Sequence, residues 1–209
     1  MGLSNYGQLK AAVADTLNRD DMTSQIVDSI TLCEAMVNRD PKFQNRFMET
    51  TSTLTFDAAG EASLPTDFIA ARTLVFQSSP RSNLEFLSPS GFETKFPSTA
   101  TGLPINYTIV GDKVKIGPPP NSGAGAVLRY YQRVPALTND SDTNWLLTYY
   151  PDIYLYGTLV HTAPYLGEDA RLQTWYGMLD RAAAELAGQD SRARFNGSPV
   201  VPSVAVTIV

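Results

Sequence analysis

The sequence predicts an α+β protein in which two helical regions flank a central run of short strands and an extended arm follows. Three observations predict this order. Apolar residues recur at helical spacing near both ends of the chain, which indicates amphipathic helices. In the middle, apolar and polar residues alternate, as is typical of half-buried strands. The last ten residues, from Val200, are apolar, largely β-branched and interrupted by a proline.

The first helical region predicts two short helices joined by a tight turn, which form a helical hairpin. Ser4 is a suitable N-cap for a helix over residues 4–18, in which Leu9, Val13 and Leu17 recur every four residues. The second helix is expected over residues 23–38. Asp40-Pro41 ends it, because the residue before a proline is disfavoured in helical geometry.

The middle region predicts five or six short strands. Its clearest pair is a hairpin over residues 104–117 with its turn at Gly111-Asp112. Ser88 and Pro89 fit the N-cap and first position of one helical turn. Since no helix is expected to connect parallel partners, the sheet is expected to be antiparallel. The other strands are expected over residues 46–56, 83–87 and 126–133, with turns at 58–60 and 64–68. Residues 69–77 are expected to form a strand or a short helix that leads into one.

Residues 143–166 contain a dense run of aromatic side chains: Trp145, Tyr149, Tyr150, Tyr154, Tyr156 and Tyr165. Pro151 fits the first position of a helix, and Asp152 suits its positive end. A loop is therefore expected up to Tyr150 and a helix from Pro151. Apolar residues surround most of this helix, which predicts a central helix buried on more than one side. It is too short, and too interrupted by Pro164, to span a bilayer.

The longest helix is expected over residues 168–187, with acidic residues at its start and Gly188 placed to end it. Its apolar stripe comprises Leu172, Trp175, Tyr176, Leu179, Ala183 and Leu186. Residues 189–209 then form an extended arm that begins with a polar hinge around Arg192 and Arg194. Because a free apolar strand exposes an edge for pairing, the arm is expected to dock on a partner or neighbour.

Composition argues against several classes of function. The net charge is −5 and there is no block of lysine or arginine, which disfavours a protein that grips nucleic acid. One cysteine, Cys33, forms no disulfide framework. This use of cysteine is consistent with synthesis in the cytoplasm. The first residues lack the apolar segment of a secretory signal, so no signal peptide is expected.

The sequence predicts no catalytic, cofactor-binding or metal site, and therefore no enzyme. His161 is the only histidine and lies in an apolar helix, where a structural role is favoured over catalysis. One histidine and one cysteine cannot form a usual zinc site. Gly123-Ala124-Gly125 lacks the lysine of a phosphate-binding loop and precedes a strand. Two interpretations of Asp140 and Asp142 stay open: the pair binds a cation, or it belongs to an acidic turn that is only solvated.

Two interpretations of the aromatic run stay open. Ile153, Tyr156 and Val160 are expected to pack in a core. Tyr149 and Tyr150 precede the helix, where a core role and a protein- or sugar-binding surface are both open, because tyrosine and tryptophan provide large contact areas.

Six short motifs follow one another along the chain. They are Leu64-Pro65-Thr66-Asp67-Phe68, Ile116-Gly117-Pro118, Tyr130-Tyr131, Val134-Pro135-Ala136-Leu137-Thr138, Asn144-Trp145-Leu146-Leu147 and Pro151-Asp152-Ile153-Tyr154-Leu155-Tyr156-Gly157. In sequence and order these motifs resemble those of the adaptor (head-to-tail connector) proteins of tailed bacteriophages. The resemblance covers most of the chain and implies an α-helical bundle, of two N-terminal and two C-terminal helices, with an inserted antiparallel β domain. It implies domains at residues 1–44, 45–134 and 135–188 and the arm at 189–209.

The resemblance also implies a function. Such a protein is made in the host cytoplasm and forms a homo-oligomeric ring, commonly a dodecamer, in the neck of the virion. The ring lies below the portal protein, joins it to a tail, nozzle or stopper protein and surrounds the channel for DNA ejection. Specific nucleic-acid binding and membrane contact are not expected, and DNA passes through the lumen.

Contact residues follow from the same resemblance. Portal contact is expected from Arg192, Arg194, Val200, Val201, Pro202, Val204, Val206, Ile208 and Val209. Subunit or tail contact is expected from Asp140, Asp142, Trp145, Tyr149 and Tyr150. The alternatives are a tail-completion protein, a carbohydrate-binding module that uses the tyrosine cluster, and a cell-wall hydrolase.

Overall fold

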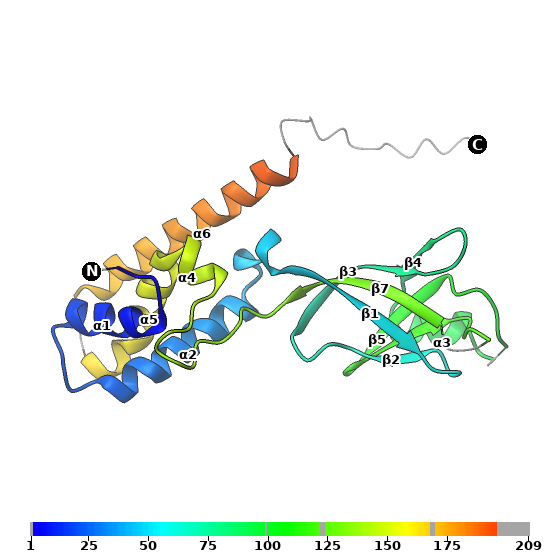
Figure 1. Cartoon of the computed structure of the whole chain (residues 1–209), viewed down its shortest axis with the longest axis horizontal. Coiled ribbons are helices and arrows are strands. Elements are labelled where there is room, and N and C mark those ends of the chain that lie inside the picture. The colour runs from blue at the N-terminus through cyan, green and yellow to red at the C-terminus, as the bar shows by residue number, and fades with distance from the viewer. Residues whose placement is uncertain (1, 99, 122–123, 168–169, 196–209) are drawn as a thin grey trace. The chain divides into compact units, whose positions relative to one another are not determined.

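The structure, a computed structural model, describes residues 2–98, 100–121, 124–167 and 170–195 (Figure 1). The chain divides into two compact units. The first consists of Met1–Phe47 and Val134–Val209 and is helical where it is described. The second, Met48–Arg133, contains the sheet.

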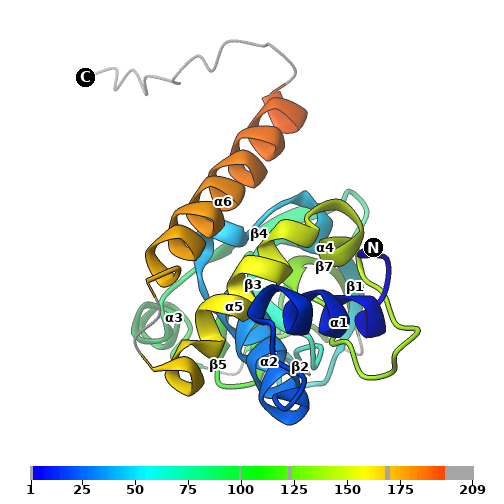
Figure 2. The same ribbon diagram turned by 90° about the vertical axis from the view of Figure 1, so that its left-hand side faces the viewer.

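The helical unit is organised around α5 (Pro151–Leu166). This helix packs against α1 (Tyr6–Leu17), α2 (Thr23–Arg39), α4 (Trp145–Tyr149) and α6 (Leu172–Phe195), as Figure 2 shows. Ile153, Tyr154 and Leu159 are completely buried, so the predicted central helix is confirmed. Among the described helices, none is both long and apolar enough to cross a membrane. Two short 3-10 turns, Pro41–Phe43 and Arg46–Met48, complete the unit.

The packing of α2 against α5 depends on a glycine. A Cβ atom at position 157 would lie only 2.5 Å from the Cys33 sulfur and 3.5 Å from the terminal carbon of Met36. The Cys33 thiol is completely buried and donates to the Ile153 carbonyl at 3.8 Å. Gly157 therefore leaves the space on α5 that the Cys33 side chain of α2 occupies.

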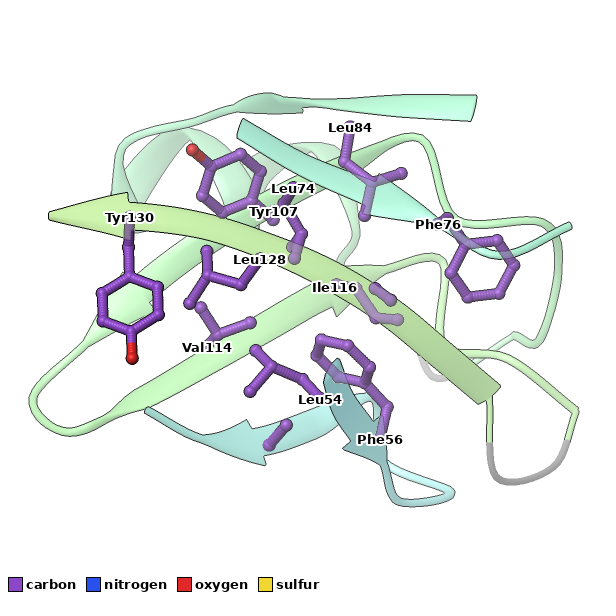
Figure 3. Packing of buried hydrophobic residues seen from close by; sticks show 12 residues of the cluster. Leu54, Phe56, Leu74, Phe76, Leu84, Tyr107, Val114, Ile116, Leu128 and Tyr130 are labelled. Carbon is purple, nitrogen blue, oxygen red and sulfur yellow. The ribbon is translucent and has the colours of Figure 1, made fainter. Parts of the chain in front are cut away.

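The sheet unit contains seven strands within the described residues, in the spatial order β1-β7-β3-β4-β5-β6-β2. A single helix of the described unit, α3 (Pro89–Lys95), lies between β4 and β5 in sequence. Apolar side chains of several strands meet in one core, shown in Figure 3. The strands are β1 (Glu49–Phe56), β2 (Glu61–Ser63), β3 (Phe68–Phe76), β4 (Ser82–Phe86), β5 (Asn106–Val110), β6 (Lys113–Gly117) and β7 (Ala124–Gln132).

The sheet nearly closes into a barrel. Its two outermost strands, β1 and β2, are consecutive in the chain and are joined by a tight turn. In that turn the Asp57 N–H donates to the Glu61 carbonyl at 3.0 Å. Gly60 has φ +76° and its carbonyl accepts the Ile116 N–H at 2.8 Å, so the turn also contacts β6. Glycine is required here, because a Cβ would lie 2.8 Å from the Ile116 oxygen.

The predicted fold class is wrong. The described residues contain six α-helices rather than four, and the β part is a seven-stranded, nearly closed barrel-like sheet rather than a small antiparallel insertion in a bundle. The sheet is also mixed, because β4 and β5 pair in parallel through Glu85–Asn106 and Phe86–Tyr107. The predicted helical turn, with Ser88 as N-cap, forms as α3 and lies in the connection between these strands. The short strand β2 lies between the turns predicted at 58–60 and 64–68 and was not predicted.

Helix boundaries also differ from the prediction. Asn5 rather than Ser4 caps α1, and α4 forms where a loop was predicted. Gly188 does not end α6, which continues to Phe195, so the first seven residues of the predicted arm are helical. Contacts stabilise this extension, because Gln189 and Asp190 both accept hydrogen bonds from other parts of the unit. Tyr176, predicted in the apolar stripe, is 46% exposed.

Candidate functional site

One surface feature of the helical unit is a cluster of Arg46, Phe47, Trp145 and Tyr149, which we call the aromatic platform. The Phe47 ring stacks on Trp145 with a centroid distance of 5.6 Å and on Tyr149 at 5.0 Å. The Arg46 guanidinium lies 4.9 Å from the centre of the Phe47 ring. Tyr149 is 60% exposed, while Phe47 and Trp145 are half-buried. The cluster therefore presents ring surface to its surroundings.

Local sequence fixes the platform residues. Asn144 caps α4 by accepting the Leu147 N–H at 2.9 Å, which orients Trp145 and Tyr149 one helical turn apart. The Phe47 N–H donates to the Asn45 side chain at 2.8 Å. Pro151 separates α4 from α5, because the residue before a proline is disfavoured in helical geometry.

The sequence left the roles of Tyr149 and Tyr150 open, and the structure places the two side chains in different environments. Tyr150 is 9% exposed, packs its ring edge-on against Phe47 and donates its hydroxyl to Gln189 at 2.9 Å. Burial is the main reason that the pKa of Tyr150 is raised. Tyr150 thus supports the platform from within, and Tyr149 is the member that is available for contact.

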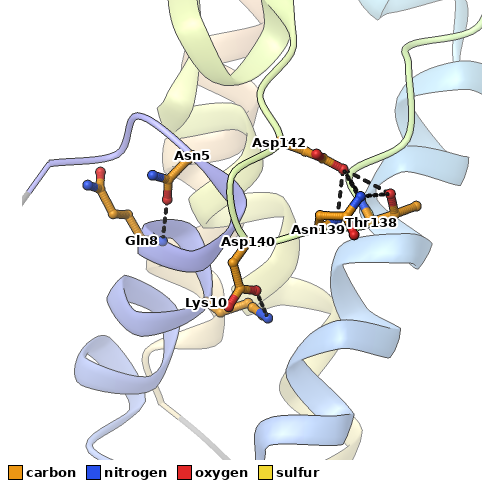
Figure 4. A network of polar contacts seen from close by, with 7 residues as sticks. All are labelled: Asn5, Gln8, Lys10, Thr138, Asn139, Asp140 and Asp142. Atoms are coloured by element: carbon orange, nitrogen blue, oxygen red, sulfur yellow. Dashed lines mark hydrogen bonds and ion pairs between the residues drawn. The ribbon is translucent and has the colours of Figure 1, made fainter.

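A second candidate is the acidic turn of residues 138–142, shown in Figure 4. The Asp142 carboxylate accepts hydrogen bonds from the backbone N–H groups of Asn139 and Thr138 and from the Thr138 hydroxyl. These bonds lower the pKa of Asp142 to about 2. Asp142 therefore stabilises its own turn.

The acidic turn docks on the start of α1. The Tyr6 and Gly7 N–H groups donate to the carbonyls of Asp142 at 2.9 Å and Asp140 at 3.0 Å, which satisfies donors of the first helical turn. Lys10 pairs with the Asp140 carboxylate at 2.7 Å (Figure 4). Within the described part of the chain, no group of three or more metal-ligating side chains gathers here or elsewhere.

A buried polar network joins α2, α4, α5 and the segment that precedes the acidic turn. The Glu34 carboxylate accepts the Leu137 N–H at 3.1 Å and the Tyr154 hydroxyl at 3.0 Å. That hydroxyl in turn accepts from the Asn144 amide at 2.7 Å, and the same amide donates to the Pro135 carbonyl at 2.7 Å. Burial raises the pKa of Glu34, and the two donated hydrogen bonds partly oppose this effect.

His161 lies half-buried on α5. Burial, and then the charge of Arg39, lower the pKa of this imidazole. Its Nε2 atom is buried and has no hydrogen-bond partner among the described residues. His161 is thus a packed side chain of the helical unit.

The predicted portal-contact residues fall mostly beyond the described chain. Arg192 is exposed near the end of α6. Arg194 belongs to the same helix, but its side chain lies outside the description. Val200, Val201, Pro202, Val204, Val206, Ile208 and Val209 lie outside the described residues. Their role in the arm stays a prediction.

The motifs that carried the resemblance contain residues that stabilise the fold. In the first of them, Asp67 accepts the Tyr130 hydroxyl at 2.9 Å with its side chain and the Arg133 N–H at 2.8 Å with its carbonyl. Burial, together with the Asp67 carboxylate, raises the pKa of Tyr130 to about 12. Phe68 stacks on Tyr130 at 5.7 Å. These residues close one end of the β3–β7 pair.

The aromatic platform, with exposed ring surface and a guanidinium, has a composition that is typical of protein-contact surfaces. The family model described as SU10 adaptor protein matches residues 4–203, nearly the whole chain. The chain belongs to this family of phage head-to-tail adaptors, which confirms the resemblance. It is therefore a structural component of a phage particle. No curated protein matches the chain.

Proposed function

We propose that the chain assembles as a ring, a dodecamer, below the portal of the phage head. The ring joins the portal protein to a tail, nozzle or stopper protein and surrounds the channel through which DNA leaves. Membership of the adaptor family over residues 4–203 is the observation that carries this proposal. The net charge of −5 supports it, because an acidic lumen repels DNA and lets it pass.

The aromatic platform supplies a contact for a neighbouring subunit or the tail. Trp145 and Tyr149 provide ring surface, and Tyr150 holds them in place from below. Asp140 is a further contact candidate, because its side chain is 78% exposed despite its ion pair with Lys10. Asp142 contributes by shaping the turn that presents Asp140.

The copy number of this chain in purified virions is expected to equal that of the portal protein. A ring stacked on the portal with matching symmetry requires a ratio of one to one. Quantitative mass spectrometry of intact particles, with isotope-labelled peptides of both proteins, measures the ratio. A ratio of a few copies per particle, or absence of the chain, would exclude a ring at this position.

The arm is proposed to contact the portal through residues 200–209, with Arg192 and Arg194 in support. Deleting residues 200–209 is expected to abolish attachment to portal-bearing capsids, because the apolar residues that would pair with the portal are lost. Co-sedimentation with capsids measures attachment. Leu32→Ala, which alters an exposed apolar side chain of α2 outside the arm and the platform, is the matched control and is expected to attach normally. Normal attachment of the shortened chain would refute the portal contact.

A further inference from the structure

The outer side of β1 is an open edge of the sheet (Figure 1). Strand β1 pairs with β7 on one side, and no described strand pairs with it on the other. The Asp57 N–H, just beyond β1, donates away from β7 to the Glu61 carbonyl at 3.0 Å. Backbone groups of alternate residues point to the same side of a strand. The N–H and carbonyl groups of Thr51, Thr53 and Thr55 therefore lie at the open edge.

The neighbouring strand agrees with this assignment. The Gln77 N–H donates to the Gly125 carbonyl at 3.0 Å, so Gly125, which lies opposite Thr55, faces β3 rather than β1. Sheets usually protect an open edge with lysine, proline, a bulge or a very short strand. Strand β1 has eight residues in unbroken register with β7, contains neither lysine nor proline and is rich in threonine. The edge is therefore suited to receive a further strand.

Beside the open edge lies an arginine that forms no ion pair with another described residue. Arg129 of β7 is exposed and lies opposite Thr51 of β1. Together they line an open hollow of about 310 Å³ with Thr50 and Glu49, and Glu49 pairs with Arg72 at 2.6 Å. Neighbouring strands lie about 4.8 Å apart, so a residue added opposite Thr51 would be about 10 Å from the Arg129 backbone. An acidic side chain at that position and the long arginine side chain would meet.

We propose that the open edge binds an extended segment of the tail-side partner, which adds to the sheet as a strand beside β1. The segment's backbone pairs with the N–H and carbonyl groups of Thr51 and Thr53, and an aspartate or glutamate side chain of the segment pairs with Arg129.

This proposal rests on the ring of the proposed function. In that ring the portal contact is assigned to the C-terminal arm, so the sheet unit remains for the tail-side protein. A second copy that paired β1 with β1 would make a two-fold contact. A ring of subunits with one common orientation contains no such contact.

Hydrogen exchange of the chain in three states tests the site: the free subunit, capsids that carry the chain but no tail, and complete virions. The amides of Thr51 and Thr53 are expected to exchange at least about tenfold more slowly in complete virions only, because they gain a hydrogen-bond partner there. The amides of Ser52 and Leu54 face β7 and serve as the internal control. Their exchange is expected to be the same in all three states.

Substitutions at the edge give a second measurement. Thr53→Pro removes an N–H from the open edge and none from the β1–β7 ladder, which is where a sheet tolerates proline. It is expected to reduce tail attachment to capsids by about tenfold. Thr53→Val keeps the N–H and is expected to attach normally. Arg129→Glu is expected to weaken attachment similarly, and Arg81→Glu, at an exposed arginine that precedes β4, is its matched control.

The outcomes separate strand addition from the ring. Unchanged exchange of Thr51 and Thr53 in complete virions, or normal tail attachment of Thr53→Pro, overturns strand addition and leaves the ring intact. Slow exchange already present in tail-less capsids assigns the edge to a neighbouring subunit and overturns the tail-side assignment. Absence of the chain from virions overturns the ring and the strand addition together.

Discussion

Gly157→Val is expected to lower the free energy of unfolding of the helical unit by about 3 kcal/mol. Even the first added carbon would lie 2.5 Å from the Cys33 sulfur, which is completely buried between α2 and α5. The helices must therefore separate, and α5 is in contact with all four other α-helices of the unit. Urea unfolding followed by tryptophan fluorescence measures the loss, since both tryptophans belong to this unit.

Gly177→Val is the matched control. Position 177 is an exposed site on α6, and an added Cβ there would meet no atom within 4 Å. Valine has a higher helix propensity than glycine, so this variant is expected to be neutral or slightly more stable. Cys33→Ala removes the sulfur atom with which the new valine side chain would clash. Combined with Gly157→Val, it is expected to restore about 1–2 kcal/mol. An additive loss in the double variant would contradict the proposed clash.

The elements that the sequence predicted well are those with local signals. The hairpin β5–β6 forms around Gly111, which has φ +62°, and α3 begins after Ser88 as expected from its capping side chain. Helix α5 begins at Pro151, as its proline indicates. In each case a residue's own backbone preference determines where the element begins or turns.

The elements that were not predicted from the sequence depend on partners that are distant along the chain. Strand β2 has three residues and exists through its pairing with β6. The parallel pair β4–β5 comprises two residue pairs, which no periodicity indicates. Near-closure of the sheet depends on the contact of the Gly60 turn with Ile116. Alternation of apolar and polar residues predicts strands but not the order in which they pair.

The residues of the aromatic platform also divide into those that the sequence indicated and those that only the fold brings together. Trp145 and Tyr149 were candidates from the sequence because they lie within one aromatic run. Phe47 was assigned to a strand, and only the fold brings its ring onto theirs. Glu34 was also missed, although a signal was present, because it lies four residues after Ile30 on the apolar face of α2. A carboxylate at such a position indicates a buried hydrogen-bond network.

Asn144→Ala is expected to cost the helical unit about 2–4 kcal/mol. The substitution removes the cap of α4 and leaves the Leu147 N–H and the Pro135 carbonyl without this partner. It also removes the donor to the Tyr154 hydroxyl. Urea unfolding by tryptophan fluorescence again measures the loss. Asn139→Ala, at an exposed position in the acidic turn, is the control and is expected to change stability much less.

The pH dependence of the folding stability tests the contribution of Glu34 to this network. Because burial raises the pKa of Glu34 above its value in the unfolded chain, the folded state binds a proton more tightly. The stability that this proton binding contributes is fully present at acidic pH and is lost as the pH rises through the raised pKa. Glu34→Gln keeps an oxygen acceptor for the Leu137 N–H and removes the titration, so its stability is expected to fall less over this pH range. Equal pH slopes for the two proteins would show that Glu34 titrates as it does in the unfolded chain. In that case the Glu34 carboxylate would stabilise the network only as a hydrogen-bond acceptor. The stability lost in Asn144→Ala would then come from the cap of α4 and from the hydrogen bonds that the Asn144 amide donates.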